Sequence, residues 1–414
     1  MSWSYLGTGC YWNQTVRNRP RGMGLGDGTV LTCQRDQFSI PDGLHYLNCA
    51  YMGPLPRVAE EAGIVGLRMK RDPSLILPHH FFDTSLELRT LFARLVGAGE
   101  PSRISIGPGV SYAVAVAARN LPLSSGQNVV LTHEQFPANV HAWARKTRDA
   151  SAELRLVRPP STIHRGATWN EHLLAAIDSA TAVVSLPTVH WTDGTLFDLV
   201  QVSRRCREVG AALVVDGTQS VGALPFDLEL VRPDMLVCST YKWLLGPYSV
   251  ALTYFGPRFD DGVPLEETWI GREGSEDFEH LVDYRDDYQP GAIRYDVAQR
   301  SNFALLPVAI ASLRLVAGWG PARIQAYCMD LTHTLFEEVE ELGFTVEDAR
   351  WRSAHLFGLR MPKRIDLIGL REALRVREVS VSLRGSALRV SPNVYNDAGD
   401  VSALLEGLRE VAGA

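Results

Sequence analysis

The sequence predicts an α/β protein, with a large domain built on a mostly parallel sheet and a smaller α+β domain at the C-terminal end. Short β-branched, apolar runs alternate with helical patterns from about residue 85 onward. Apolar strands separated by helices are typical of a parallel sheet that is covered on both faces. Near residue 300 this alternation gives way to one long helical pattern and a mixed tail, which indicates the second domain.

Five runs are expected to be strands of the large sheet: 128–132, 181–186, 211–215, 234–238 and 249–254. Helical patterns lie between them, for example at 170–180 and 199–210, and a long apolar helix is expected through FALLPVAIASLRLVAGW. We expect a flexible extension, a large domain and a small C-terminal domain at 1–33, 34–306 and 307–414, with residues 34–60 packing partly with the small domain.

The composition excludes several classes of protein. The chain has 414 residues, 46% hydrophobic and 21% charged, and a net charge of −6. This charge gives no sign of a nucleic-acid or anionic-membrane partner. The sequence shows neither a long apolar run nor an N-terminal signal pattern, so a cytoplasmic protein is expected. The six cysteines are scattered without a CxxC pair, and neither a metal site nor a disulfide framework is expected.

Two reactive side chains follow neighbouring predicted strands. Asp216 comes directly after AALVV, and Lys242 follows DMLVCSTY. Ligands of open α/β sheets sit beyond the carboxyl ends of the strands, so both side chains are expected in one crevice. A desolvated lysine amine can condense with an aldehyde, and a carboxylate can keep a pyridine nitrogen protonated. The pair favours a Schiff-base cofactor over the alternative of a helix-capping Asp216 and a solvated loop lysine.

A phosphate site is expected at the start of a helix. Gly107-Pro108-Gly109-Val110-Ser111 precedes the helical run YAVAVAARNL. A helix N-terminus offers free N–H groups and the positive end of the helix dipole. Ser239 and Tyr241, which lie just before Lys242 in sequence, are placed to complete this site. The stretch is neither GxGxxG nor a P-loop, and an ordinary capped turn is the alternative.

DGTQSVGALPFDL followed by STYKWLLGP resembles the class V aminotransferase group of fold type I pyridoxal-phosphate (PLP) enzymes. This group includes cysteine desulfurases, kynureninases, isopenicillin-N-epimerase-like proteins and C–S lyases. The resemblance runs from about Phe38 to the C-terminus. It implies the fold type I architecture, pyridoxal 5'-phosphate as cofactor and a homodimer with active sites at the interface.

The resemblance also implies roles for individual residues. Lys242 would bind the cofactor covalently and move the Cα proton, and Asp216 would pair with the ring nitrogen. Phe136 would stack on the ring and Gln219 would hydrogen-bond its hydroxyl. Val110, Ser111, Ser239 and Tyr241 would contact the phosphate. Arg389 would grip the substrate α-carboxylate, which suits the fork of a guanidinium group.

Other residues are expected at the rim of the site. Thr268 and Trp269 lie where the family has a loop that reaches the phosphate of the neighbouring subunit, and Arg272 and Arg294 are candidates for contact with substrate. His190 and Trp191 follow another strand and are candidate pocket residues, with a structural role as the alternative.

The reaction is less firmly indicated than the cofactor. Cys328 is the only cysteine after Lys242 and lies in a helical pattern, which disfavours a desulfurase that forms a persulfide. We expect a C–S lyase that performs β-elimination on a cysteine S-conjugate. Decarboxylation with oxidative deamination, epimerisation and transamination are the alternatives. A PLP-binding sensor without catalysis is the non-enzyme alternative, and an NAD-binding protein is disfavoured because GxGxxG is missing.

Overall fold

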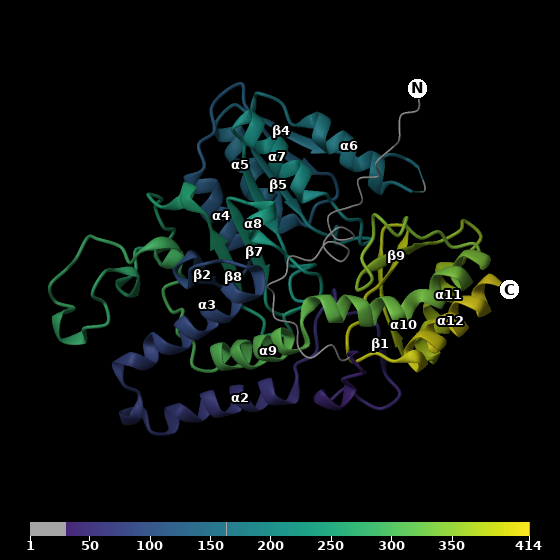
Figure 1. Cartoon of the computed structure of the whole chain (residues 1–414). Helices are drawn as coiled ribbons and strands as arrows, with labels where there is room; N and C mark the ends of the chain where they lie inside the picture. The colour runs from purple at the N-terminus through teal and green to yellow at the C-terminus, as the bar shows by residue number, and fades with distance from the viewer. Residues whose placement is uncertain (1–29, 163, 414) are drawn as a thin grey trace.

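Seven strands form the main sheet of the computed structural model, which describes residues 30–162 and 164–413 (Figure 1). Most of the expected extension, residues 1–29, lies outside the described residues. The strand order is β2-β8-β7-β6-β5-β3-β4. Strand β8 is antiparallel to both neighbours and the other pairs are parallel. The strands are β2 (Ile104–Gly107), β3 (Asn128–Thr132), β4 (Glu153–Val157), β5 (Thr181–Pro187), β6 (Ala212–Asp216), β7 (Met235–Ser239) and β8 (Ala251–Phe255).

The five strands expected from sequence correspond to β3, β5, β6, β7 and β8, with limits within two residues. Sequence reasoning missed β2 and β4, which are the two edge strands of the sheet. An edge strand pairs on one side only and can carry charged residues, as ELRLV in β4 does. Such a strand lacks the continuous apolar run by which the central strands were found.

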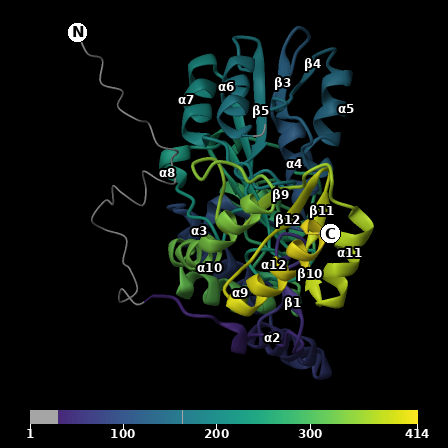
Figure 2. The same cartoon turned by 90° about the vertical axis from the view of Figure 1, so that its right-hand side faces the viewer.

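Helices cover both faces of the sheet (Figure 2). One face packs on α3, α6, α7 and α9, and the other packs on α4 and α5. Successive residues point to opposite faces, so that Val214 packs with α4 and α5 while Val215 packs with the other layer. These helices are α3 (Asp83–Val96), α4 (Val110–Asn120), α5 (His141–Asp149), α6 (Gly166–Ala176), α7 (Leu199–Val209) and α9 (Leu305–Trp319), and a short α8 spans Leu228–Val231.

The C-terminal part forms a small domain with a core of its own. Its antiparallel sheet has the order β11-β12-β9, with β9 (Phe357–Arg360), β11 (Ser382–Arg384) and β12 (Ala387–Val390). Helices α10 (Pro321–Glu341), α11 (Leu367–Val376) and α12 (Ala398–Ala412) pack around it. Near the N-terminus, β1 (His45–Tyr46) pairs with β10 (Val379–Ser380), and α2 (Arg57–Arg68) then packs along α9.

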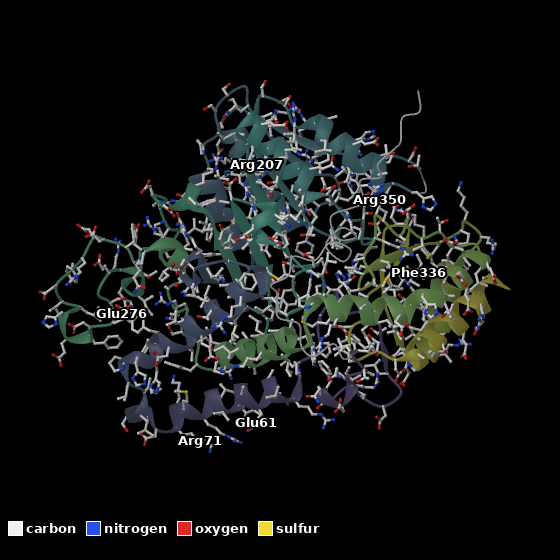
Figure 3. All side chains as sticks on the ribbon, in the orientation of Figure 1. Glu61, Arg71, Arg207, Glu276, Phe336 and Arg350 are labelled. Carbon is white, nitrogen blue, oxygen red and sulfur yellow. The ribbon has the colours of Figure 1, made fainter. Side chains whose placement is uncertain are left out.

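The expected fold class, a mostly parallel sheet domain with a smaller α+β domain, is confirmed. Many charged side chains lie on the outside, among them Glu61, Arg207, Glu276 and Arg350 (Figure 3). Within the described residues no single helix is long and apolar enough to cross a membrane. Helices α9 and α10 reach that length and composition only together, and they meet at a bend of 69°.

Gly222 lies against the segment that carries Lys242, and its backbone requires glycine. Its φ is +105°, and a Cβ atom would come within 2.5 Å of the Trp243 carbonyl oxygen. Gly210 is a matched control because it has a φ of +79° with nothing within 4 Å of its Cβ position. We expect Gly210→Ala to lower the free energy of unfolding by about 1 kcal/mol through backbone strain. Gly222→Ala is expected to lower the free energy of unfolding by about 1–3 kcal/mol more than Gly210→Ala, because its Cβ would collide with the Trp243 carbonyl oxygen. Urea denaturation measures both, and equal losses would contradict the predicted contact.

Candidate active site

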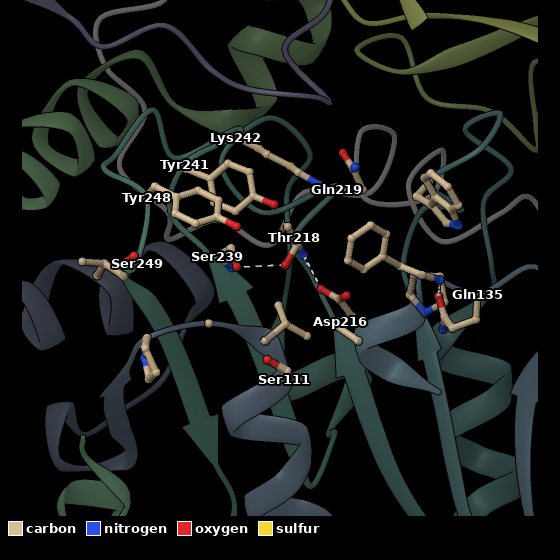
Figure 4. Close-up of a pocket in the computed structure, with 18 of the residues that line it drawn as sticks. Ser111, Gln135, Asp216, Thr218, Gln219, Ser239, Tyr241, Lys242, Tyr248 and Ser249 are labelled. Atoms are coloured by element: carbon tan, nitrogen blue, oxygen red, sulfur yellow. Dashed lines mark hydrogen bonds between the residues drawn. The ribbon is translucent and has the colours of Figure 1, made fainter. Parts of the chain in front are cut away.

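A cavity of about 290 Å³ lies at the carboxyl ends of β6 and β7 and the N-terminus of α4 (Figure 4). Its volume is close to the lower end of the range for small-molecule sites, roughly 300 Å³. All eight residues predicted on this subunit for the cofactor line it: Val110, Ser111, Phe136, Asp216, Gln219, Ser239, Tyr241 and Lys242. The tertiary structure therefore brings together residues from segments more than 100 positions apart in sequence.

Lys242 is held in a largely dry environment, with 6% of its surface exposed. Burial lowers the pKa of its amine from 10.5 to about 8, because the charged form loses its hydration. Asp216 opposes this effect, and Arg389 adds to it. The amine lies 5.5 Å from the centre of the Phe136 ring and 5.4 Å from that of Tyr241. It is thus positioned as a nucleophile and a proton carrier.

Asp216 is fixed as an acceptor by two donors. The Asn139 amide donates to Oδ2 at 2.6 Å, and the backbone N–H of Thr218 donates to Oδ1 at 2.8 Å. Thr218 in turn accepts from the Ser239 N–H at 3.1 Å through its hydroxyl, which ties the ends of β6 and β7 together. Sequence reasoning missed both supporting residues. Thr218 lies inside the DGTQ motif that begins at Asp216, whereas no sequence motif marks Asn139.

The part of the cavity at the N-terminus of α4 suits an anion. Helix α4 begins at Val110, and Gly109 before it provides no side-chain cap. The first N–H groups of a helix have no acceptor within it, so the amides of Val110 and Ser111 need an outside partner. A phosphate group fits this demand. Tyr248 and Ser249, which sequence reasoning missed, line the same cavity beside Tyr241.

Arg389 lies on β12, where 1% of its surface is exposed. Its Nη1 donates to the Trp191 carbonyl oxygen at 2.8 Å, while Nε and Nη2 have no partner among the described residues. Burial lowers its pKa from 12.5 to about 9. Trp191 lines the cavity and meets Phe136 edge to face at 5.4 Å. The two unpartnered nitrogens, next to the cavity wall, fit a carboxylate group.

Gln219 has two protein partners as well as a place on the cavity wall. Its Nε2 donates to the Ala50 carbonyl oxygen at 3.1 Å, and its Oε1 accepts from the Trp243 indole at 3.0 Å. The side-chain amide retains one N–H for a ligand. Its predicted contact with a ring hydroxyl stays a prediction.

The remaining predicted residues lie away from this cavity in the single chain. His190 is fully buried, with Nδ1 at 2.8 Å from the Thr192 hydroxyl, and burial lowers its pKa to about 4. Trp191, next to it, is the one that reaches the cavity. Thr268, Trp269 and Arg272 line a separate hollow in the segment between β8 and α9, which extends away from the small domain (Figure 1). Arg294 stacks on Tyr288 of the same segment. Their predicted roles remain predictions.

None of the described cysteines is placed as a reactive thiol in the cavity. Cys328 is buried in α10, where its Sγ contacts the Pro392 carbonyl oxygen. Cys49 lies beside the Lys242 carbonyl oxygen, but burial raises its pKa to about 11 and keeps it protonated.

A buried amine, an anchored carboxylate and a helix N-terminus around one cavity, on this two-domain α/β scaffold, define a fold type I pyridoxal-phosphate-dependent enzyme. The family model "Aminotransferase class-V" matches residues 77–404. The chain belongs to this family, whose members bind pyridoxal 5'-phosphate and act on amino acids.

The similar proteins are enzymes with different activities. The chain is 26% identical to isopenicillin N epimerase of Streptomyces clavuligerus, over 89% of this chain and 94% of that protein. It is 28% identical to kynureninase of Pseudomonas fluorescens, over 79% and 77%. Among solved structures it is similar to a C-DES mutant with glycine covalently linked to the PLP cofactor. The TM-score is 0.79 at 18% identity, over 92% of this chain and all of that one.

The lowered pKa of Lys242 predicts how cofactor attachment depends on pH. A neutral amine attacks an aldehyde, so the attachment rate of added pyridoxal 5'-phosphate should rise with pH and level off, with a midpoint of about 8. Asp216→Asn should move this midpoint to lower pH, because the carboxylate stabilises the charged amine. Borohydride trapping followed by mass spectrometry of the Lys242 peptide measures the rate. A midpoint near 10.4, that of a free lysine, would contradict the burial effect.

Proposed function

We propose that this chain binds pyridoxal 5'-phosphate through Lys242 and catalyses β-elimination from a cysteine S-conjugate, as a C–S lyase. The observation that carries the cofactor assignment is the shared cavity of a buried amine with a pKa of about 8, an anchored carboxylate and the N-terminus of α4. Each of these groups matches one part of the cofactor: the aldehyde, the ring nitrogen and the phosphate.

The cavity residues would hold the cofactor in one orientation. Asp216 would face the ring nitrogen, and Phe136 would cover one face of the ring. Gln219 would reach the ring hydroxyl. The phosphate would contact the α4 N-terminus together with Ser239 and Tyr241. When bound, pyridoxal 5'-phosphate supplies an electron-accepting ring that stabilises the negative charge left when a bond to Cα breaks.

The chain's own residues then control which bond breaks. Arg389 holds the substrate carboxylate through its two unpartnered nitrogens and so fixes the orientation of Cα. The Lys242 amine takes the Cα proton. In β-elimination the Cα–H and Cβ–S bonds break, a thiolate leaves, and a proton from the site converts it to a thiol. Hydrolysis of the remaining fragment yields pyruvate and ammonia.

The residues that line the cavity favour the lyase over the epimerase and the desulfurase. Among the described residues that line it, Lys242 carries the only amine or imidazole. Elimination needs one such base at Cα, whereas a two-base epimerase needs a second on the opposite face. A persulfide-forming desulfurase needs a reactive cysteine, and Cys49 and Cys328 are both buried and protonated. The complex of the cystine C–S lyase C-DES with its reaction product, cysteine persulfide, has a TM-score of 0.78 with this chain, which is a likeness of fold.

The second candidate function is epimerisation, because isopenicillin N epimerases match over most of their length. Tyr241 and Tyr248 line the cavity and are the candidate second proton donors. Transamination and decarboxylation with oxidative deamination use the same groups. A PLP-binding sensor remains the non-enzyme alternative, although it has no need of Arg389 as a carboxylate clamp.

We propose also that the chain works as a homodimer. The segment between β8 and α9 carries an aromatic cluster in which Trp269 and Phe278 pack on Phe81 and Phe82. Tyr284 and Val282 of this segment are 95% and 77% exposed. A second copy of the chain would cover these side chains and bring Thr268 and Trp269 to its phosphate site.

The cofactor assignment predicts a visible absorption band that depends on Lys242. Purified protein loaded with pyridoxal 5'-phosphate should show the band, and Lys242→Ala should lose or shift it. Lys363→Ala, at an exposed lysine of the small domain, should leave it unchanged. Absence of any band in the wild-type protein after loading would contradict the assignment.

The loaded protein then distinguishes the reactions. We expect cysteine S-conjugates to release thiol and pyruvate in equal amounts, measured by a thiol reagent and a coupled pyruvate assay. An inverted amino acid without thiol would select the epimerase, a keto acid with aminated cofactor the transaminase, and carbon dioxide the decarboxylase. No product from any of these, with a normal band, would favour the sensor.

The carboxylate clamp predicts a separate effect on substrate binding. Arg389→Gln should raise the KM for the S-conjugate by about ten- to a hundredfold, because a charge-assisted pair is lost. The Lys242-dependent band should persist, since Arg389 does not line the cofactor cavity. An unchanged KM would contradict the clamp.

A further inference from the structure

A second cationic side chain, Arg384, lies beside Arg389 on the small-domain sheet. Ser382 of β11 is opposite Arg389 of β12, and Arg384 is opposite Ala387. Residues opposite each other, and residues two apart along one strand, lie on the same face of a sheet. Arg384 and Arg389 are therefore diagonal neighbours on one face, about 7–8 Å apart at their backbones. On the third strand, β9, Arg360 is opposite Ala387 and shares this face.

The arginines of this face differ in how their charges are balanced. Asp193 pairs with Arg360, and also with Arg165 at 2.7 Å, so both of these charges have a carboxylate partner. Among the described residues, no carboxylate lies within ion-pair distance of Arg384 or Arg389. Arg384 donates one N–H to the Leu383 carbonyl oxygen at 2.8 Å, and its buried Nε has no partner.

A second cavity, of about 370 Å³, opens in front of Arg384. It is lined also by Arg165, Arg360, Asp193 and Glu134. This cavity and the candidate active site share two wall residues, Gln135 and Trp191, so the two spaces adjoin. The Arg384 guanidinium lies 5.5 Å from the centre of the Trp191 ring, whose indole N–H is held by the Glu134 carbonyl oxygen at 2.7 Å. Trp191 thus lines both spaces where they adjoin, and its ring steadies Arg384 there.

The packing of the loop that carries Trp191 fixes this arrangement. Gly358 of β9 faces Asp193, and a Cβ atom at this position would lie 2.7 Å from the Asp193 Cβ. Gly194, with a φ of +77°, lies against the Leu356 backbone in the same way. The loop that carries Trp191 therefore lies close against the small-domain sheet that carries Arg384 and Arg389.

We propose that Arg384 binds a second carboxylate, at the far end of the substrate's side chain, so that the enzyme acts on amino acids or cysteine conjugates with two carboxylate groups. Arg389 would hold the α-carboxylate and Arg384 the distal one, on either side of Trp191. Arg360 is less suited to this role because Asp193 already balances its charge. This inference rests on the proposed function, since it assigns a substrate class to the same site.

The test is equilibrium binding to the PLP-loaded protein, measured by titration calorimetry with carboxylic acids that cannot react. Succinate, glutarate, adipate and pimelate are compared with butanoate, pentanoate, hexanoate and heptanoate, the monocarboxylates of equal carbon number. We expect at least one dicarboxylate to bind about tenfold or more tightly than its partner. Arg384→Gln should remove this preference and leave monocarboxylate affinity unchanged, which also shows that the site is intact. Arg384→Lys should keep part of the preference for the dicarboxylate, because the lysine retains the positive charge.

Arg371→Gln is the matched control, because Arg371 is an exposed arginine of the same domain that lines neither cavity. The preference should survive in this variant. Equal affinities within every pair for the wild-type protein, survival of the preference in Arg384→Gln, or its loss in Arg371→Gln would each overturn the role of Arg384. Absence of the Lys242-dependent band would count against the proposed function instead, so the two failures are distinguishable.

Discussion

The parallel pairing of β6 with β7 is the constraint on which the candidate site depends. Asp216 is opposite Val237, so both strands end at the same edge of the sheet. The Ser239 N–H then bonds the Thr218 hydroxyl, and the Thr240 N–H bonds the Val250 carbonyl oxygen. These bonds fix the backbone directly before Lys242. The sheet thus sets where the Lys242 side chain leaves the backbone, and the rings of Phe136 and Tyr241 lie beside its amine.

Lys242 and Asp216 have different surroundings at the carboxyl ends of β6 and β7. Burial lowers the pKa of Lys242 because nothing replaces the water lost by the ammonium group. Asp216 accepts two hydrogen bonds, which hold its carboxyl group in place. One cavity therefore offers a nucleophilic amine and a carboxylate at once. This combination suits a cofactor that has an aldehyde and a ring nitrogen.

In the proposed function, the small domain provides the substrate side of the site. Arg389 reaches the cavity wall through its bond to the Trp191 carbonyl oxygen, so β12 and a loop of the large domain form the wall together. Both Arg389 and its neighbour Arg384 have nitrogens without partners. These nitrogens can donate hydrogen bonds to an anionic ligand at this wall. The cofactor chemistry is common to the family, and this wall is where substrate choice has room to differ.

The sequence by itself determined the central strands, the α4 N-terminus and the positions of Asp216 and Lys242 after two of those strands. Each depends on a continuous local pattern: an apolar strand followed by polar residues, or glycines followed by a helix. Only the tertiary structure decided that Trp191 and not His190 reaches the cavity, that Asn139 holds Asp216, and that Arg384 adjoins the site. Such contacts join segments far apart in the chain. They depend on strand register, on which face a side chain takes and on close backbone approach, none of which a local pattern specifies.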